Sequence, residues 1–525
     1  MPRLVSHACV WRLAMTVLYF MNSNFWTENR TIVALAVSIL ALAEIVDLTI
    51  VSVALPHIMG ALNANINEVS LTMTSYIVAA AVFIPLTGIV SKKFGMKTVI
   101  LASTIVFGVS SILCGMSTNL PEMVVFRLIQ GVGGAFLPSL AQAYIVENFS
   151  HEEQPKIMTV YSMCLVLGPV IGPLFGGYMV EHLSWRWIFY VNVPVCILGF
   201  ILVLILMEKS RIEEVSADFI SFIFMVIGVS CLEFFLDEGN QNNWFESNEM
   251  IIVLAVGIVG LTFFIWRGLL GKSVVNFKLF KDLNFNLSCL LVFGFMVTVV
   301  MALAYFPTLL QQGYNYPVDL AGYITAPRGV FAFLAAPIFI ALGKKIDPRK
   351  LIFIGLLIFT FSNYLLTTFG DSASKSLILI TVTLQGMGLT GTFVMMLQCA
   401  FITLPANLYS DSSGVFNFFR NIGSSVGTSI AATLISHQQQ ASWHDQINNI
   451  SLANLKFERF FEGLREFQPT LAVKAQISSG IIQTQSFLVA NIDTIWAALL
   501  GTGLILWIPF ALKKPKPGAH VDMMH

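Results

Sequence analysis

Apolar runs long enough to cross a lipid bilayer recur along almost the whole chain. A transmembrane helix needs about 20 mostly apolar residues to span the hydrocarbon core. Fourteen such runs occupy residues 32–56, 70–91, 98–116, 121–146, 157–180, 187–207, 218–236, 250–269, 286–311, 319–342, 351–369, 376–403, 414–436 and 490–512. Charged residues form only 11% of the 525-residue chain, against about 25% in soluble domains. The sequence therefore predicts an all-α polytopic membrane protein embedded in the lipid bilayer.

Lysine and arginine are distributed unevenly between the connectors. The connectors after even-numbered runs, together with the C-terminal tail, hold seventeen: Lys92, Lys93, Lys97, Lys156, Lys209, Arg211, Arg267, Lys272, Lys278, Lys281, Lys344, Lys345, Arg349, Lys350, Lys513, Lys514 and Lys516. The short connectors after odd-numbered runs hold two, Arg186 and Lys375. Cytoplasmic loops of membrane proteins carry an excess of Lys and Arg. We therefore predict that both termini lie in the cytoplasm.

Three segments lie outside the fourteen runs. Residues 1–30 mix apolar patches with charges, and form either a cytoplasmic extension or a segment upstream of a true start at Met21. Residues 513–525 form a cytoplasmic tail. The long outer connector 437–489 begins with a polar stretch and then carries apolar residues near helical spacing over 452–467, which predicts an amphipathic helix. This helix either lies on the bilayer or the protein surface, or docks a partner.

Five ionisable residues lie deep inside the apolar runs: Glu44, Asp47, Arg127, Arg328 and Arg420. A charge in lipid costs several kcal/mol, so each should face a partner or a water-filled cavity. Glu44 and Asp47 are three residues apart and share one face of a helix. Burial and mutual repulsion favour their neutral forms, whereas a nearby Arg favours the charged form. This arrangement predicts a proton site, with Asp47 as the carrier, Arg127 as the group that tunes it, and Glu44 as a second acid or a reader of substrate charge.

The same charges also allow simpler arrangements. Asp47 and Arg127 alone could form a static buried ion pair. Arg328 and Arg420 do not deprotonate, so they either organise helices or meet acidic groups of a ligand in a cavity. A further acid, Glu233, lies near the end of its run and is predicted to be interfacial.

The run at 157–180 combines glycine and proline in an unusual way, at Gly168, Pro169, Gly172, Pro173, Gly176 and Gly177. Glycines at i, i+4 and i+8 fall on one face of a helix and leave a ridge without side chains. Such a ridge lets two helices in lipid approach backbone to backbone, and each proline removes an N–H and bends the helix. We expect a helix that seals against a neighbour during gating. A tightly packed but static helix pair is the alternative.

The remaining composition argues against several classes of function. The formal net charge is zero, so no basic surface favours nucleic acid as a partner. The seven cysteines form no CxxC pair and nearly all lie in apolar runs, which predicts neither a metal site nor a cofactor. HExxH and nucleotide-loop motifs are missing, so we do not expect an enzyme. An integral membrane enzyme is the alternative from a different class.

Four ordered motifs are similar to those of a known transporter family. RLIQGVGGA (Arg127–Ala135) resembles the fourth-helix motif RxxQGxGxA of the major facilitator superfamily. GPVIGPLFGG (168–177) resembles the antiporter motif in the fifth helix of its exporters. DLTIVSVALP (47–56) and SWRWIFYVNVP (184–194) resemble motifs of its fourteen-helix drug:proton antiporter family. The resemblance covers roughly residues 31–512.

The resemblance implies both an architecture and a function. It implies the major facilitator fold, with six-helix bundles at 31–208 and 273–512 joined by two extra transmembrane helices within 209–272. It implies a proton-coupled multidrug efflux pump for hydrophobic or amphipathic compounds in the cell inner membrane, working by alternating access. Its similarity to the pumps of tripartite systems further implies a periplasmic membrane-fusion adaptor and an outer-membrane channel as partners. A dedicated exporter of one metabolite, such as a siderophore or a fatty acid, is the alternative on the same scaffold.

One motif departs from the family pattern. The loop GIVSKKFGMK (Gly88–Lys97) has Lys92 where the superfamily pattern GxLaDRxGRrk has an Asp. In the family, that Asp helps to latch the gate when the inner side is closed. The resemblance therefore does not imply that this loop carries the family's usual charge relay.

Overall fold

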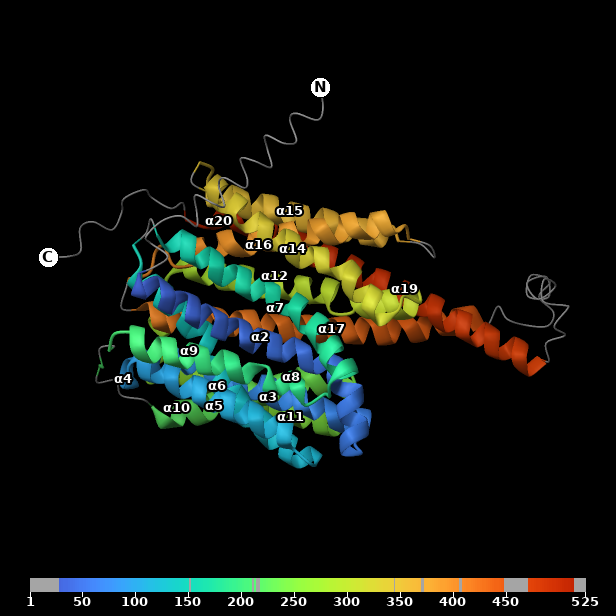
Figure 1. The fold of residues 1–525 in the computed structure, drawn as a ribbon, viewed down its shortest axis with the longest axis horizontal. Coiled ribbons are helices and arrows are strands. Elements are labelled where there is room, and N and C mark those ends of the chain that lie inside the picture. Colours follow the sequence, from blue (N-terminus) through green and yellow to red (C-terminus); the bar gives the residue numbers. More distant parts are fainter. Residues whose placement is uncertain are drawn as a thin grey trace, which may run out of the picture.

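The fold is entirely helical within the residues that the structure describes. The computed structural model describes residues 28–150, 153–209, 212–213, 218–343, 345–369, 373–405, 408–447 and 471–513. Long helices run side by side across the molecule, and no strand occurs in this part of the chain (Figure 1). Twelve helical segments are long and apolar enough to cross a membrane. The predicted all-α polytopic class is confirmed.

The helices fall into two bundles and a linking hairpin. The first bundle contains α2 (Asn29–Leu62), α3 (Ile66–Phe83), η2 (Ile84–Leu86), α4 (Thr87–Phe94), α5 (Met96–Met116), α6 (Leu120–Asn148), α7 (Gln154–His182), α8 (Trp187–Tyr190) and α9 (Asn192–Leu206). The linking hairpin contains α10 (Phe219–Glu238), η3 (Trp244–Glu246) and α11 (Asn248–Leu269). The second bundle contains η4 (Phe277–Lys281), α12 (Leu283–Leu303), α13 (Phe306–Thr308), η5 (Leu309–Gly313), α14 (Val318–Gly343), α15 (Pro348–Thr367), α16 (Lys375–Ala400), α17 (Tyr409–Ile447), α19 (Leu471–Ile505) and α20 (Ile508–Ala511).

Every predicted membrane run coincides with a helix or with consecutive helices. The twelve apolar segments account for all but two of the runs, and α7 and α17, which are 29 and 39 residues long, fill the other two positions. Helix α17 is less apolar because it carries many Ser, Asn and Gln side chains. Its polar residues are tolerated because much of its first half is buried against other helices rather than against lipid.

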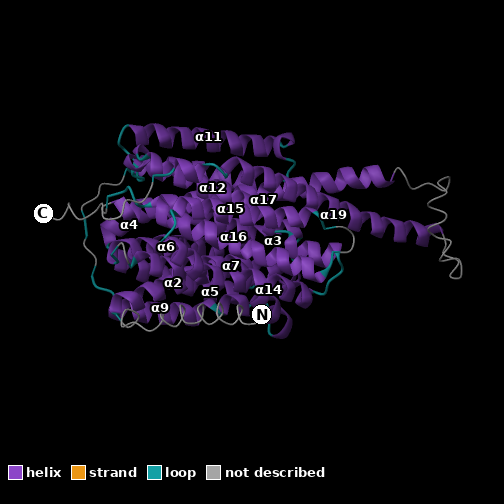
Figure 2. Ribbon diagram, turned by 90° about the horizontal axis from the view of Figure 1, so that it is seen from above, coloured by secondary structure: helices purple, strands orange, loops and turns teal. Residues whose placement is uncertain are grey.

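The outer connector differs from its prediction. Helix α17 continues to Ile447, and α19 already begins at Leu471 (Figure 1). The end of α19 projects well beyond the other helices in both ribbon views, and Figure 2 shows both helical ends projecting. The predicted amphipathic helix at 452–467 lies outside the described residues, as do residues 1–27 and 514–525.

Local sequence explains where several helices begin. Asn65 caps α3 by accepting a hydrogen bond from the Glu68 backbone N–H at 2.8 Å, and the Glu68 carboxylate accepts one from the Asn65 N–H at 2.9 Å. Ser374 caps α16 in a similar way through the N–H of Leu377. Such caps satisfy N–H groups that have no partner inside the helix.

Glycines set the helix packing at equivalent places in the two bundles. The letters QGxG occur in α6 and again in α16. A Cβ on the second glycine in α6, Gly133, would lie 2.6 Å from the backbone N of Phe107 in α5. A Cβ on its counterpart in α16, Gly388, would lie 2.5 Å from the backbone N of Phe359 in α15. The two bundles therefore repeat the same close helix contact.

Three sets of contacts hold the units together. The start of α17 packs on η2, α4 and α6, while α14 and α16 pack on α7. Helix α10 packs on α3 of the first bundle and on α17 of the second, so the linking hairpin touches both. Helix α11 packs mainly on α10 and lies along one edge of the molecule (Figure 2).

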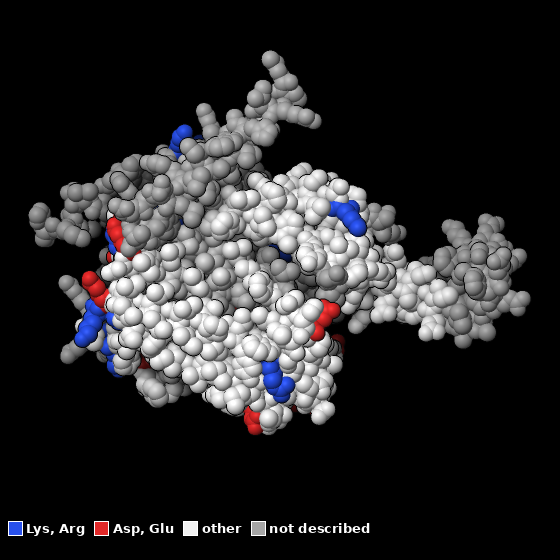
Figure 3. All heavy atoms as spheres, viewed as in Figure 1, with Lys and Arg blue, Asp and Glu red and all other residues white. Residues whose placement is uncertain are grey.

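The surface has the pattern that a bilayer requires. Charged side chains gather toward the two ends of the face in Figure 3, and a broad uncharged band lies between them. Large apolar side chains such as Ile205 of α9, Val259 of α11 and Leu504 of α19 are exposed. An apolar band between charged ends fits the hydrocarbon core of a membrane.

Candidate functional site

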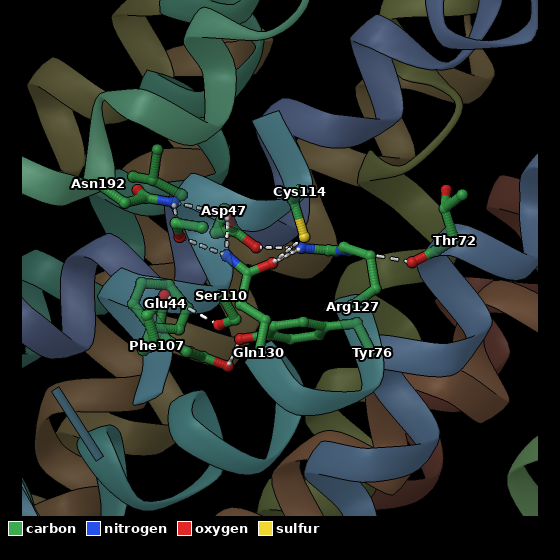
Figure 4. Close-up of polar contacts among 12 residues, drawn as sticks. Glu44, Asp47, Thr72, Tyr76, Phe107, Ser110, Cys114, Arg127, Gln130 and Asn192 are labelled. Carbon is green, nitrogen blue, oxygen red and sulfur yellow. Dashed lines mark hydrogen bonds and ion pairs between the residues drawn. The ribbon is translucent and has the colours of Figure 1, made fainter. Parts of the chain in front are cut away.

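Two of the predicted ionisable residues form a buried ion pair between α2 and α6. Arg127 Nη1 lies 2.5 Å from Asp47 Oδ2, and neither side chain has any exposed surface (Figure 4). Removing one partner of such a pair leaves an uncompensated buried charge, which typically costs about 3–5 kcal/mol. The pair therefore ties α2 to α6 in this conformation.

Two side-chain amides complete the environment of Asp47. Gln130 Nε2 donates to Asp47 Oδ1 at 3.0 Å, and Asn192 Nδ2 donates to the same oxygen at 2.6 Å. Gln130 also donates to Ser111 Oγ of α5 at 2.7 Å. Residues from α2, α5, α6 and α9 thus meet at one point. Three donors on its two oxygens thus fix the Asp47 side chain in place.

Helix α3 holds the other side of Arg127. Its Nε donates to the Thr72 carbonyl at 3.0 Å, and its guanidinium lies 4.3 Å from the ring centroid of Tyr76 and 5.8 Å from that of Phe189. Its Nη2 has no hydrogen-bond partner among the described residues. The guanidinium is therefore fixed on several sides but keeps one N–H edge available to a further acceptor.

Glu44 lies one turn before Asp47 and has a different environment. It is only 4% exposed, and its Oε1 lies 3.4 Å from the Tyr76 hydroxyl that donates to it. Its Oε2 has no partner among the described residues. Arg420 of α17 is the cation that acts most strongly on Glu44, ahead of Arg127. Glu44 is therefore the less firmly held of the two acids, and Arg420, the cation with the strongest effect on it, belongs to the second bundle.

A glycine of the fourth-helix motif makes room for this acid. A Cβ on Gly134 would overlap the Tyr76 hydroxyl and lie 3.2 Å from Cγ of Glu44. Any larger residue at this position would displace the contact between Glu44 and Tyr76. The motif therefore supplies both the arginine and the space beside it.

The glycine ridge of α7 packs directly on α2. A Cβ on Gly172 would overlap the Thr49 hydroxyl and lie 3.1 Å from the backbone N of Ile50. Gly168 and Gly176 meet the same face of α2 one turn to either side. Thr49 Oγ1 also donates to the Gly168 carbonyl at 3.2 Å. The ridge thus presses against the helix that carries both buried acids.

Gly177, a further predicted residue of this run, lies away from that contact. A Cβ on Gly177 would meet nothing within 4 Å, so the packing role expected for Gly177 is wrong. One residue along a helix turns the side-chain direction by about 100°, which rotates Gly177 off the ridge. Pro169 is exposed, and the side chain of Pro173 lies outside the described part of the structure. Helix α7 continues through all of these positions.

Arg328 lies in a neutral counterpart of the Asp47 site, in the second bundle. Its Nη2 donates to Gln385 Oε1 at 3.0 Å, and Gln385 Nε2 donates to Asn363 Oδ1 at 2.9 Å. Gln385 belongs to the QGxG of α16, as Gln130 belongs to that of α6. Arg328 is 9% exposed, and its Nε has no hydrogen-bond partner among the described residues. Its guanidinium lies over the Phe306 ring.

An ion pair joins the two bundles at the predicted cytoplasmic end. Lys92 Nζ lies 2.6 Å from Asp411 Oδ2, and Asn276 Nδ2 donates to the same oxygen at 3.1 Å. Gly88 packs so closely on Asp411 that an added Cβ would overlap its carboxylate. The loop in which the family pattern has an acid thus supplies the cation, and the start of α17 supplies the anion. We call this contact, formed by Lys92 and Asp411, the inner latch.

Comparison with known proteins shows where this architecture belongs. The Major Facilitator Superfamily profile matches residues 37–428. The chain belongs to the major facilitator superfamily. The superfamily's proton:xylose symporter XylE, in its solved structure, matches this fold with a TM-score of 0.59 at 13% identity, over 93% of this chain and 96% of that one. The fold class expected from the sequence motifs is confirmed.

Among curated members of the superfamily, several export proteins are similar over most of their length. Multidrug export protein EmrB of Haemophilus influenzae is 32% identical over 490 residues, which are 91% of this chain and 95% of that protein. Multidrug export protein EmrB of Escherichia coli K12 is 29% identical over 503 residues, which are 93% and 96% of the two chains. Fatty acid resistance protein FarB of Neisseria gonorrhoeae is 31% identical over 412 residues, which are 77% and 80%.

The superfamily motifs contain site residues that the sequence analysis did not select. Gln130 lies one turn after Arg127 in the fourth-helix motif, and Asn192 lies in the motif SWRWIFYVNVP. Both are amides inside apolar runs, which is the signal that could have identified them. Glu233, which is predicted to be interfacial, has no exposed side-chain surface because other helices cover it.

Proposed function

We propose that this chain is a proton-coupled exporter of hydrophobic and amphipathic drugs, set in a cell inner membrane with both termini in the cytoplasm. Its similarity to two EmrB proteins over nearly the whole chain supports drug export. The observation that carries proton coupling is the pair of buried acids on α2, one held by Arg127 and one facing the second bundle. Ionisable groups are expensive inside a membrane and mark proton pathways.

We assign the proton to Glu44 in this conformation. Asp47 accepts hydrogen bonds from three donors, one of them a guanidinium, and these favour its charged form. Glu44 accepts a single bond at 3.4 Å and is out of water, which favours the neutral acid. The sequence favoured Asp47 as the carrier, and the geometry supports moving that role to Glu44 for as long as Arg127 stays on Asp47.

The proton then alters the attraction between the bundles. An ionised Glu44 attracts Arg420 of α17, whereas a protonated Glu44 does not. Arg127 keeps an unbonded Nη2 edge, so it can turn toward an ionised Glu44 and leave Asp47 free to accept a proton. Helix α2 is locked to α7 by the glycine ridge, and α7 packs on α14 and α16. A charge change at Glu44 therefore acts on the contact about which the bundles move.

The proposal includes a tripartite assembly. The ends of α17 and α19 extend beyond the bundles on the predicted outer side (Figure 1). A projecting pair of helices offers a docking surface away from the lipid. We assign this surface to a periplasmic membrane-fusion adaptor, which would connect the pump to an outer-membrane channel.

A dedicated exporter of one acidic metabolite is the second candidate. One relative that is 31% identical is named for fatty acid resistance. Arg328 is a buried cation that donates a hydrogen bond to a neutral amide, so a carboxylate ligand would suit it electrostatically. Arg328→Gln should then impair export of fatty acids and leave export of cationic drugs intact.

Drug efflux from proteoliposomes under an imposed pH gradient tests the main proposal. Glu44→Gln keeps the shape of the side chain but cannot release a proton, so it should bind drug and lose gradient-driven efflux. Asp47→Asn and Arg127→Ala should impair efflux and also lower thermal stability, because each leaves the other charge buried without its partner. Glu181→Gln, an exposed acid on α7, is the matched control and should transport as the wild type does. Wild-type efflux in Glu44→Gln would return the role of carrier to Asp47.

A further inference from the structure

A third buried acid lies outside the Asp47 site, on the first helix of the linking hairpin. Glu233 of α10 has no exposed surface, and neither of its carboxylate oxygens has a hydrogen-bond partner among the described residues. The polar groups that act on it are the Ser425 hydroxyl of α17 and the carboxylate of Asp237, one turn further along α10. A fully buried carboxylate that has one nearby hydroxyl and no cation is far more costly to bury than the neutral acid. This conformation therefore accommodates Glu233 with its proton.

No cation is available to compensate a charge at Glu233 within the described part of the chain. On its own helix the neighbouring charged groups are Asp237 and Glu238, which are also acids. The tyrosine on which Asp237 acts is Tyr305, which lies between α12 and α13. On α17, Arg420 acts on Glu44 and is not among the groups that act on Glu233.

The other helices packed on α10 bring no counter-charge either. The ionisable side chains of α3 are Glu68, which caps the start of the helix, and Tyr76, which is bound to Glu44. Those of α11 are Glu249 in its first turn and Arg267 in its last turn. Arg267 is paired with Asp218, at the far end of α10 from Glu233. An ionised Glu233 would thus have no cation among the described residues to compensate its charge.

The end of α10 beyond Glu233 is bonded to the first bundle. The Thr74 hydroxyl of α3 donates to the Asp237 carboxylate, and the Ser70 hydroxyl donates to Glu238 Oε1 at 3.2 Å. Both contacts lie at the predicted outer end of α3. These two contacts connect the end of α10 to the first bundle.

The same end of α10 is also bonded to α17 of the second bundle. The Ser429 hydroxyl donates to the Leu236 carbonyl, and Ser436 Oγ donates to Asn240 Oδ1 at 3.1 Å. Trp244 Nε1, which follows the helix, donates to Thr433 Oγ1 at 3.1 Å. The hairpin therefore bridges the two bundles at the predicted outer end, and Glu233 lies just inside that bridge.

We propose that Glu233 is a proton-binding residue that controls this bridge: α10 and α17 close on each other only when Glu233 carries a proton. An ionised Glu233 inside the closed contact would lack a compensating cation, so loss of the proton parts α10 from α17 and admits water to the carboxylate. Protons from the outer side thereby favour closure of the outer end. The inference deepens the proposed proton-coupled export, but the closing step can be measured without any transport.

Spin labels across the contact test the proposal in the full-length protein. Gln241→Cys and Gln438→Cys place labels at two exposed positions, one after α10 and one on α17, in a background that lacks Cys9 and Cys231. Distances are measured by double electron–electron resonance in lipid nanodiscs between about pH 5 and pH 9, a range that spans the titration of buried carboxylates. We expect a single short distance in acid and a growing longer population as the pH rises. Glu233→Gln should keep the short distance at every pH, and Glu246→Gln, an exposed acid nearby, should behave as the wild type does.

Two results with the wild type and Glu233→Gln would overturn the inference, and a third with Glu44→Gln would do the same. One is a pH-dependent distance that persists unchanged in Glu233→Gln, and the other is a wild-type distance that does not respond to pH. The Glu44→Gln variant separates this inference from the proposed function. If the pH response of the distance disappears in Glu44→Gln, the switch belongs to the α2 site and the inference fails. If that response remains while efflux proves independent of the pH gradient, the inference holds and proton-coupled export fails.

Discussion

Reversing the charge of Lys92 should open the inner latch. In the structure, its ammonium lies 2.6 Å from the Asp411 carboxylate, and the two side chains are 19% and 10% exposed. Lys92→Asp replaces this attraction with repulsion between two carboxylates and leaves Asn276 as the remaining donor to Asp411. The contact between α4 and the start of α17 should therefore separate more often.

The expected size of the effect follows from burial. An exposed ion pair contributes under about 1 kcal/mol, whereas a hydrogen bond between charged groups that are largely out of water contributes about 1.5–3 kcal/mol. For this mostly buried pair we take about 2 kcal/mol. Because about 1.4 kcal/mol changes an equilibrium constant tenfold, losing the pair should raise the population with an open inner end about 30-fold.

Accessibility of a residue behind the latch measures this population. Ser413 of α17 is buried in the latched conformation, so Ser413→Cys should react slowly with a membrane-impermeant thiol reagent in inverted vesicles. Lys92→Asp should speed the reaction by about the same factor of 30, since only the open form reacts. Lys93→Asp, which changes an exposed neighbour, should not.

A double variant in which the two residues are exchanged tests whether their charges hold the inner latch closed. Lys92→Asp combined with Asp411→Lys restores the attraction and should recover much of the protection of Ser413→Cys. Recovery should be incomplete, because the longer lysine must pass Gly88, which packs directly on position 411. If the double variant reacts as fast as Lys92→Asp alone, the latch depends on shape and not on charge, and the reasoning is refuted.

Three further predictions concern other parts of the molecule. Gly172→Leu should insert normally but lose transport, with overpacking of about 1–3 kcal/mol against α2, while Gly177→Leu should be tolerated; efflux assays compare them. The Arg267 hydrogen bond lowers the pKa of Asp218 below 3.8, so Arg267→Gln should destabilise the protein at neutral pH, with the difference vanishing in acid below that pKa, as thermal unfolding at a series of pH values would show. A cysteine at Gln439 should label from outside in intact spheroplasts; labelling only after permeabilisation would contradict the topology.

The membrane helices were predictable from sequence because their signal is local. Twenty apolar residues in a row need no information from elsewhere in the chain, and every predicted run became helical. The same signal says nothing about a helix that continues into water, so the projecting ends of α17 and α19 were assigned to a connector. Their polar residues, such as the glutamines after His437, are compatible with a helix and with a loop alike.

Only the site residues that are costly to bury could be predicted from the sequence. Asp47 and Arg127 stood out because a charge inside an apolar run demands a partner, and they do form a pair. Asn192 donates to the same carboxylate from 145 positions away, and nothing in its own neighbourhood indicates that approach. The burial of Glu233 was not predictable for a related reason. Distance from the end of a run measures depth along one helix, but burial comes from α3, α11 and α17 packing around α10.

The two QGxG helices carry a consequence for how such a protein diversifies. Gln130 reaches an acid, Asp47, whereas Gln385 reaches an amide, Asn363. The two halves share this motif but differ in chemistry. The first half has a titratable group, Asp47, beside its glutamine, and the second half has a cation, Arg328, among neutral amides. The proposed energy source resides in the first half, and Arg328, the contact suggested for an acidic cargo, resides in the second. Variants selected for a new cargo should therefore gather in the neutral half, where they can reshape recognition without disturbing the supply of energy.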